Sequence, residues 1–274
     1  MTASPIRAEY PELAAPDPAW RGTGFTATLR RELLLLTRNR TNLLLAVVPT
    51  AVYIALFATS LTGLIAEVTY RGETISYPDF AIPALMFSSL LAAATTSGTA
   101  LFQERMSGMA LELWSYPLTR RQYVVGKLLA GSVLVLAQTV AALAVSAALL
   151  RGRWPADRWL ALLCGALIAA LAFNALYLLL ATLVRDFQRF TVLVNVLGPV
   201  LLFASPSFYP IERMGTWQSW LATVNPVTYG VTALREALLH GFAGCWPYLL
   251  AMGVVGGLAA AGVGRALVRQ ARSL

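Results

Sequence analysis

Long stretches without charge dominate this sequence of 274 residues. A helix needs roughly 20 predominantly apolar residues to cross the hydrocarbon of a bilayer. Seven stretches reach or approach that length: Thr41–Ala66, Phe80–Gln103, Leu128–Leu150, Trp159–Val184, Phe190–Ile211, Met214–Leu234 and Ala237–Gly264. Hydrophobic residues make up 58% of the chain and charged residues only 12%, against about a quarter in soluble proteins. The pattern therefore predicts an all-α polytopic membrane protein.

The sixth stretch differs from the others. It contains Gln218, Asn225 and Pro226 and has no unbroken apolar core. Lipid-exposed backbone would be hard to satisfy there, because hydrocarbon offers no hydrogen-bond partners. We expect two short helical pieces that enter the outer leaflet and return, which makes residues 212–236 an outer re-entrant helical hairpin with its turn at Asn225 and Pro226. Six transmembrane helices remain, and both termini then lie on one side.

Lys and Arg indicate which side that is, because cytoplasmic loops are enriched in them. With a cytoplasmic N-terminus, 15 of the 21 basic residues lie inside and 6 outside, whereas a seven-span arrangement would give 13 and 8. The strong preference for Arg over Lys is typical of GC-rich bacterial genomes. We therefore expect a multi-pass protein of the bacterial cell (inner) membrane with cytoplasmic N- and C-termini. The net charge of +8 then reflects topology and contact with anionic lipid, and no nucleic-acid partner is expected.

An interfacial helix is predicted just before the first span. Phe25, Leu29 and Leu33 recur at helical spacing, and Arg30 marks the polar side of that helix. The alternative is that this segment extends the first span toward the N-terminus. No cleavable signal peptide is expected, because no apolar run follows the initial Met. The predicted division is a flexible cytoplasmic N-terminus (1–24), the interfacial helix (25–40), the six-span transmembrane domain (41–264) and a cytoplasmic tail (265–274).

The chain shows no means of powering transport by itself. No Asp, Glu, Lys or Arg lies at mid-membrane depth in the six spans, where ion-coupled transporters ordinarily need one. Gly126 and Lys127 are followed by Leu128, at a position where a phosphate-binding loop requires Ser or Thr. His240 has no ligand or base partner near it in sequence, so it is expected to be a boundary residue. We expect no catalytic residue, metal or cofactor on this chain.

The charged, proline-broken segment 104–127 is the only sizeable cytoplasmic surface that a partner could hold. Gln103–Ser115 is predicted to be a short helix that ends before Pro117. Thr119 then caps a second helix, with Gln122 completing a capping box, and this helix continues into the third span. A force on the short helix would therefore be transmitted to a rigid helix.

Two motifs resemble type-two ATP-binding-cassette (ABC) exporter permeases, in particular the daunorubicin-resistance efflux group. "QERMSGMALELWSYPLTRRQYVVGKLLAG" is similar to that family's first cytoplasmic loop, and "NPVTYGVTALREALLHG" is similar to its segment before the last span. The resemblance implies a permease dimer of two copies or of this chain and a paralogue. It also implies two copies of a separate ABC ATPase subunit, which bind ATP and Mg.

The same resemblance implies that segment 104–127 is the coupling loop that contacts the ATPase. Its candidate contact residues are Glu104, Arg105, Met106, Met109, Glu112, Leu113, Tyr116, Pro117, Thr119 and Arg120. A solvated rim is the alternative explanation for the charged members of this set.

Small residues recur within the spans and let helix backbones approach closely. Gly98, Gly165, Gly253 and Gly257 are therefore expected at helix contacts, with a subunit interface as the alternative.

Polar side chains within the spans could line a translocation path at the dimer seam, or they could hydrogen-bond between helices. They are Thr95, Thr96, Gln138, Asn174 and Asn195. A route without fixed charge suits a hydrophobic or amphiphilic drug or natural product, exported from the cytoplasm or the inner leaflet. The alternatives are export of a lipid-linked glycan or polysaccharide by the same fold, and a non-transporting scaffold, channel subunit or membrane enzyme.

Overall fold

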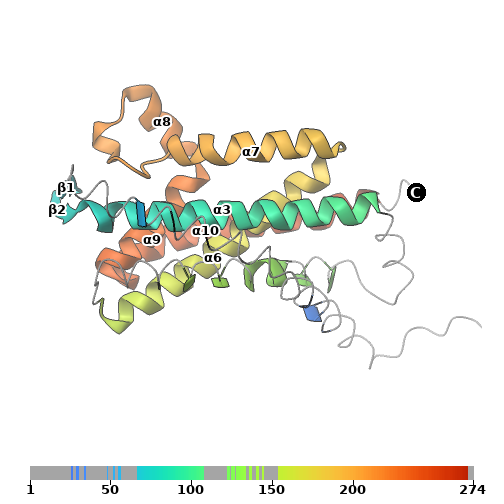
Figure 1. The fold of residues 1–274 in the computed structure, drawn as a ribbon, viewed down its shortest axis with the longest axis horizontal. Coiled ribbons are helices and arrows are strands. Elements are labelled where there is room, and N and C mark those ends of the chain that lie inside the picture. Colours follow the sequence, from blue (N-terminus) through green and yellow to red (C-terminus); the bar gives the residue numbers. More distant parts are fainter. Residues whose placement is uncertain are drawn as a thin grey trace, which may run out of the picture.

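The computed structural model describes residues 67–107 and 154–270 without interruption, together with separate positions between 26 and 56 and between 122 and 144. Residues 1–24, 271–274 and much of the predicted spans Thr41–Ala66 and Leu128–Leu150 lie outside this description. The described part is a bundle of long helices with a small β-hairpin at one end (Figure 1).

Three described helices are long and apolar enough to cross a membrane, by length and composition. They are α3 (Tyr77–Met106), α6 (Ala156–Leu183) and α10 (Phe242–Gln270). A fourth apolar helix, α7 (Phe187–Phe203), is shorter. In Figure 1, α7 lies alongside α3 and runs in the opposite direction along the bundle.

Helix α3 packs against α6, α7 and α9. Phe87 meets Phe173 of α6 edge to face, with ring centroids 5.0 Å apart. Near the other end of α3, Phe102 stacks on Phe190 of α7 at 5.6 Å. Both ends of α3 are therefore tied to neighbouring helices by aromatic contacts, which add to the area burial that drives packing.

A β-hairpin precedes α3, and the all-α prediction misses it. Strands β1 (Glu67–Tyr70) and β2 (Glu73–Ser76) pair antiparallel, with Tyr70 opposite Glu73. Arg71 and Gly72 form the turn, with φ of 52° and 85°, which matches the two-residue turn that suits the twist of a hairpin. Ser76 then caps α3 by accepting from the Asp79 N–H, so the helix begins at Tyr77 and the predicted start at Phe80 is late.

The predicted span Phe190–Ile211 is helical only in its first part. Helix α7 ends at Phe203, and the following Ser205 hydroxyl donates to the Leu202 carbonyl, which occupies one of the helix's terminal acceptors. The chain then passes through a short 3-10 helix, η2 (Ile211–Arg213). Because Pro206 follows Ser205, continuation of the helix is disfavoured at this point.

Two helices, α8 (Thr216–Val224) and α9 (Pro226–His240), fill the segment before the last long helix. They are separated at Asn225, whose Oδ1 accepts from the Val227 N–H at 2.9 Å while its Nδ2 donates to the Leu201 carbonyl at 2.6 Å. Asn225 therefore caps α9 and also binds the end of α7. Pro226 occupies the first position of α9, where its missing N–H is harmless.

The last long helix begins later than the predicted Ala237. Helix α9 continues to His240, and Gly241 breaks it with a φ of 66°. A residue with a Cβ is strained in that conformation, so the glycine separates α9 from α10. We refer below to the end of the bundle with β1, β2, α8 and α9 as the hairpin end, and to the opposite end as the Met106 end.

Glycines at helix contacts only partly match the prediction. A Cβ on Gly98 would lie 2.9 Å from the Phe190 ring, which confirms a close contact there. A Cβ on Gly253 or Gly257 would meet no atom of the described part within 4 Å, so these two glycines do not pack against another described helix. Their neighbour Gly256 does, because a Cβ there would lie 2.7 Å from the Ala172 Cα.

Adjacent glycines of α10 provide a test of this packing. Gly256→Val should destabilise the protein by about 1–3 kcal/mol, because the added atoms would force α10 away from α6. Gly257→Val should leave stability nearly unchanged. The thermal unfolding midpoint of the detergent-purified protein measures both, and equal midpoints for the two variants would contradict the packing described.

Candidate functional site

At the Met106 end, the last turn of α3 is joined to a later part of the chain. Tyr123 donates its hydroxyl hydrogen to Glu104 Oε2 at 2.8 Å, and both side chains are buried. The Glu104 carboxylate therefore points into the protein and binds Tyr123. Since 19 residues separate the two in sequence, the bond closes the base of the predicted coupling loop.

The remaining predicted coupling residues are only partly located. Met106 is 71% exposed at the end of α3. Arg105 lies in the same turn, and its side chain is outside the described part. Also outside it are Met109, Glu112, Leu113, Tyr116, Pro117, Thr119 and Arg120. Within the predicted interfacial helix, Leu29 and Arg30 are helical, while Phe25 and Leu33 lie outside the description.

The predicted path residues that the structure describes lie on three helices, α3, α6 and α7. Thr95 and Thr96 donate to carbonyls of their own helix, Leu91 and Ala92. Asn195 is exposed on α7, and Gln138 is outside the described residues.

Asn174 is the most deeply placed of the predicted path residues. It is fully buried in α6, and its Nδ2 donates to the Leu128 carbonyl at 3.1 Å. Its Oδ1 has no hydrogen-bond partner in the described part of the chain. The contact that the structure gives Asn174 is thus one between helices.

Arg235 organises the hairpin end, and its guanidinium is fully buried. Its Nε donates to the Phe80 carbonyl and its Nη2 to the Ser207 carbonyl, each at 3.0 Å. The guanidinium carbon also lies 3.7 Å from the centroid of the Phe80 ring, a cation–π contact. Arg235 therefore connects α9 to the start of α3 and to the chain after α7.

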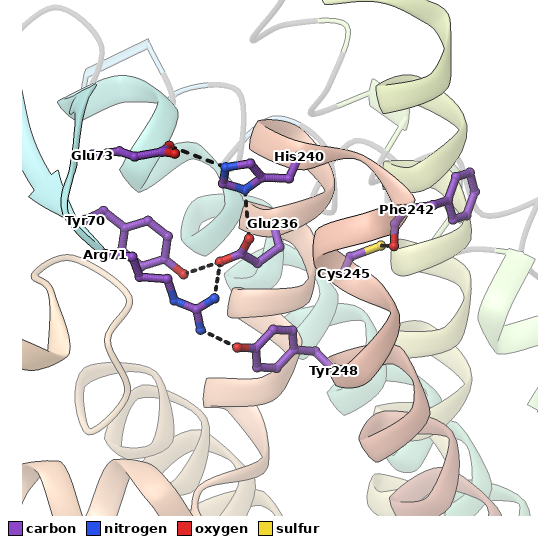
Figure 2. A network of polar contacts seen from close by, with 8 residues as sticks. All are labelled: Tyr70, Arg71, Glu73, Glu236, His240, Phe242, Cys245 and Tyr248. Carbon is purple, nitrogen blue, oxygen red and sulfur yellow. Dashed lines mark hydrogen bonds and ion pairs between the residues drawn. The ribbon is translucent and has the colours of Figure 1, made fainter.

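Glu236, the next residue of α9, is buried and has three partners (Figure 2). Tyr70 donates to its Oε1 at 2.8 Å, and Arg71 Nη1 lies 2.8 Å from the same oxygen. His240 Nδ1 lies 2.9 Å from Oε2. Burial raises the pKa of the Tyr70 phenol, so its hydroxyl stays protonated and remains a donor.

The network extends from Glu236 to the surface. Arg71 also donates to the Tyr248 hydroxyl of α10, and His240 Nε2 lies 3.3 Å from Glu73 Oε2. Figure 2 shows these side chains converging from the hairpin, α9 and α10. The expectation that His240 lacks partners is therefore wrong: Glu236 lies one helical turn earlier on α9, and the fold also brings Glu73 near. In the described residues, no group of three or more His, Cys, Asp or Glu side chains could hold a metal ion.

The family can now be assigned. The model of the ABC-2 type transporter family matches residues 23–239, and the chain belongs to that family. It is a transmembrane permease, a transport subunit of a family that works with an ABC ATPase, as the sequence motifs indicate. The chain is also 26% identical over 257 residues to the daunorubicin resistance ABC transporter permease protein DrrB1 of Streptomyces coeruleorubidus. That alignment covers 90% of this chain and 87% of the relative.

The importance of the Arg235 contacts can be tested by a conservative change. Arg235→Lys should lower stability by about 2 kcal/mol or more, because an ammonium cannot reproduce the two directed donors and the ring contact. Arg213→Lys, at an exposed position of η2, is the matched control and should have little effect. Thermal unfolding midpoints in detergent measure both, and a stable Arg235→Lys variant would contradict this role.

Proposed function

We propose that this chain is the permease subunit of an ATP-driven exporter that moves a hydrophobic or amphiphilic drug or natural product out of the cytoplasm or the inner leaflet. The family match over residues 23–239, together with the alignment to a daunorubicin resistance permease, carries this proposal. Two copies of an ABC ATPase would supply ATP hydrolysis, and a second permease copy or a paralogue would complete the membrane part.

The proposed orientation places the Met106 end in the cytoplasm and the hairpin end outside. The basic residues favour it, because 15 of 21 lie inside in this arrangement. Helix α10 ends at the Met106 end of the bundle in Figure 1, so the C-terminal tail would be cytoplasmic with the N-terminus. In a bacterium this is the inner membrane, and α8 with α9 would form the outer re-entrant hairpin that turns at Asn225 and Pro226.

The buried bond between Glu104 and Tyr123 supports a coupling role for the loop between them. A short loop whose two ends are joined cannot change its shape freely, so a movement of the loop displaces both flanking helices together. A hydrogen bond to a charged group in a buried site is also stronger than one between neutral groups. We propose that the ATPase contacts Met106, Met109, Leu113 and their neighbours, while Glu104 and Tyr123 hold the base of the loop.

The apolar surfaces of the bundle support a hydrophobic or amphiphilic cargo. Exposed Val192, Val196 and Val200 on α7, and exposed Leu250, Val254 and Leu258 on α10, leave apolar faces for lipid or a second subunit. Within the described apolar helices, charged side chains occur only near their ends. An amphiphilic molecule that partitions into the leaflet could reach such surfaces without crossing water.

Reconstitution tests the proposed function. The permease with its genomic neighbour ATPase, in inside-out vesicles, should accumulate daunorubicin in an ATP-dependent manner. Met109→Asp combined with Pro117→Gly should abolish this accumulation and leave membrane insertion intact, because a charge and a flexible backbone would disrupt the docking helix. Accumulation without the ATPase would overturn the proposal, and stimulation of the ATPase by a lipid-linked glycan alone would favour glycan export.

The role of the hydrogen bond between Tyr123 and Glu104 can be tested separately. Tyr123→Phe should lower ATP-dependent transport by about tenfold, since a hydrogen bond to a buried charged group contributes about 1.5 kcal/mol or more. The ATPase should continue to hydrolyse ATP, so the ratio of ATP consumed to drug moved should rise. Tyr229→Phe, which removes a hydroxyl bonded to the Thr223 carbonyl at the hairpin end, is the matched control. An unchanged ratio in Tyr123→Phe would contradict the coupling role.

A further inference from the structure

The hairpin packs Val68, Tyr70 and Ile75 into a small apolar cluster with Leu239 of α9, and its polar contacts with the α9–α10 corner centre on one carboxylate. Glu236 has a side chain that is only 4% exposed, and it binds Tyr70 and Arg71 of the hairpin. Arg71 reaches on to Tyr248 of α10. While the hairpin covers it, the Glu236 carboxylate needs these partners, so the hydrogen bond and the ion pair support the attached position of the hairpin.

Arg71 occupies a backbone conformation that favours another residue type. Both turn positions have positive φ, where Asn and Gly are preferred and a long side chain adds strain. Among the described residues, Arg71 is the one non-glycine with positive φ. Its guanidinium offsets that strain through the ion pair with Glu236 and through contacts with the Tyr70 and Tyr248 rings.

His240 makes the attachment of the hairpin depend on the protonation state of its imidazole ring. Its Nδ1 faces Glu236 and its Nε2 faces Glu73. A neutral imidazole has a single N–H and can donate to one carboxylate only, whereas the imidazolium donates to both. The other charged groups near this corner are Arg71, which pairs with Glu236, Arg235, which precedes Glu236 on α9 and lies over the Tyr70 ring, and Asp157 of α6, which lies beside Gly241. Only the protonated ring therefore satisfies both carboxylates and joins β2 to α9.

We propose that the hairpin Glu67–Ser76 is a latch on the α9–α10 corner, that it must detach during each transport cycle, and that protonation of His240 holds it closed. The transport step rests on the proposed export function, and the latch itself does not. Histidine changes its charge between about pH 5 and 8, so acid on the hairpin side would favour the closed latch.

The first test measures the latch without cargo or ATPase. Spin labels at Thr69→Cys and Leu258→Cys, with Cys164 and Cys245 replaced by Ala, report the distance from the hairpin to α10 in lipid nanodiscs. Both labelled positions are exposed. On going from pH 8 to pH 5.5, the ratio of closed to open populations should rise roughly two- to fivefold, the range expected for partly exposed charge pairs.

Matched variants identify which side chain causes this pH response. His240→Gln and Glu73→Gln should each remove the pH response, while Glu67→Gln, an exposed carboxylate at the base of the same hairpin, should keep it. Identical distance distributions at both pH values in the protein with His240 would overturn the protonation-dependent latch. A response that survives His240→Gln would overturn the assignment to His240.

The second test asks whether detachment is needed for transport. A reducible bifunctional thiol reagent should join Glu73→Cys to His240→Cys and stop ATP-dependent daunorubicin accumulation in vesicles, and reduction should restore it. Thr69→Cys with Thr74→Cys, a cross-strand pair within the hairpin, is the control and should transport normally when joined. Undiminished transport by the joined latch would overturn the transport step. If daunorubicin is not moved before cross-linking, the cargo proposal fails, and the spin-label distances still decide the latch.

Discussion

Two neighbouring side chains of opposite charge, Arg235 and Glu236, are buried at the hairpin end, where the surrounding elements of the described structure supply hydrogen-bond partners for every polar atom of the pair except Nη1 of Arg235. Successive residues of a helix point about 100° apart, so the two face different neighbours. Arg235 binds backbone carbonyls of α3 and of the chain after α7. Glu236 binds the hairpin and His240. Because buried charges are tolerated only with such partners, the position of α9 fixes the positions of the hairpin, the start of α3 and the end of α7 together.

The sequence predicted the long helices well and their ends less well. Apolar composition alone located α3, α6 and α10, because the length needed to cross hydrocarbon is a strong constraint. The helix ends depended on local chemistry that composition does not report, as at Gly241, where a positive φ separates α9 from α10. The hairpin was missed because its turn is Arg-Gly, and Asn-Gly or Asp-Gly is the usual signal.

The candidate site was likewise predicted only in part. The motif around Glu104 was recognisable because its residues are contiguous, although its bond to Tyr123 was not foreseen. The Glu236 network could not be predicted, because Arg71 and Glu236 are 165 positions apart and each resembles an ordinary loop or rim charge when viewed alone. A signal was nevertheless present, since Arg, Glu and His occur within six residues of one helix, α9, which also packs against α3 and α6.

Helix α3 joins the two ends, since it begins directly after the hairpin and carries Glu104 in its last turn. Its 30 residues extend about 45 Å, and aromatic contacts hold it to α6 and α7 along the way. Pro83 lies near its start, and because proline removes one backbone hydrogen bond, the first turns can bend relative to the remainder. Coupling between distant sites requires an element with two discrete arrangements that both sites bias. If a movement at the Met106 end displaces α3, the two discrete arrangements would be the attached and the detached hairpin. The buried charge of Glu236 would make positions between these two unfavourable.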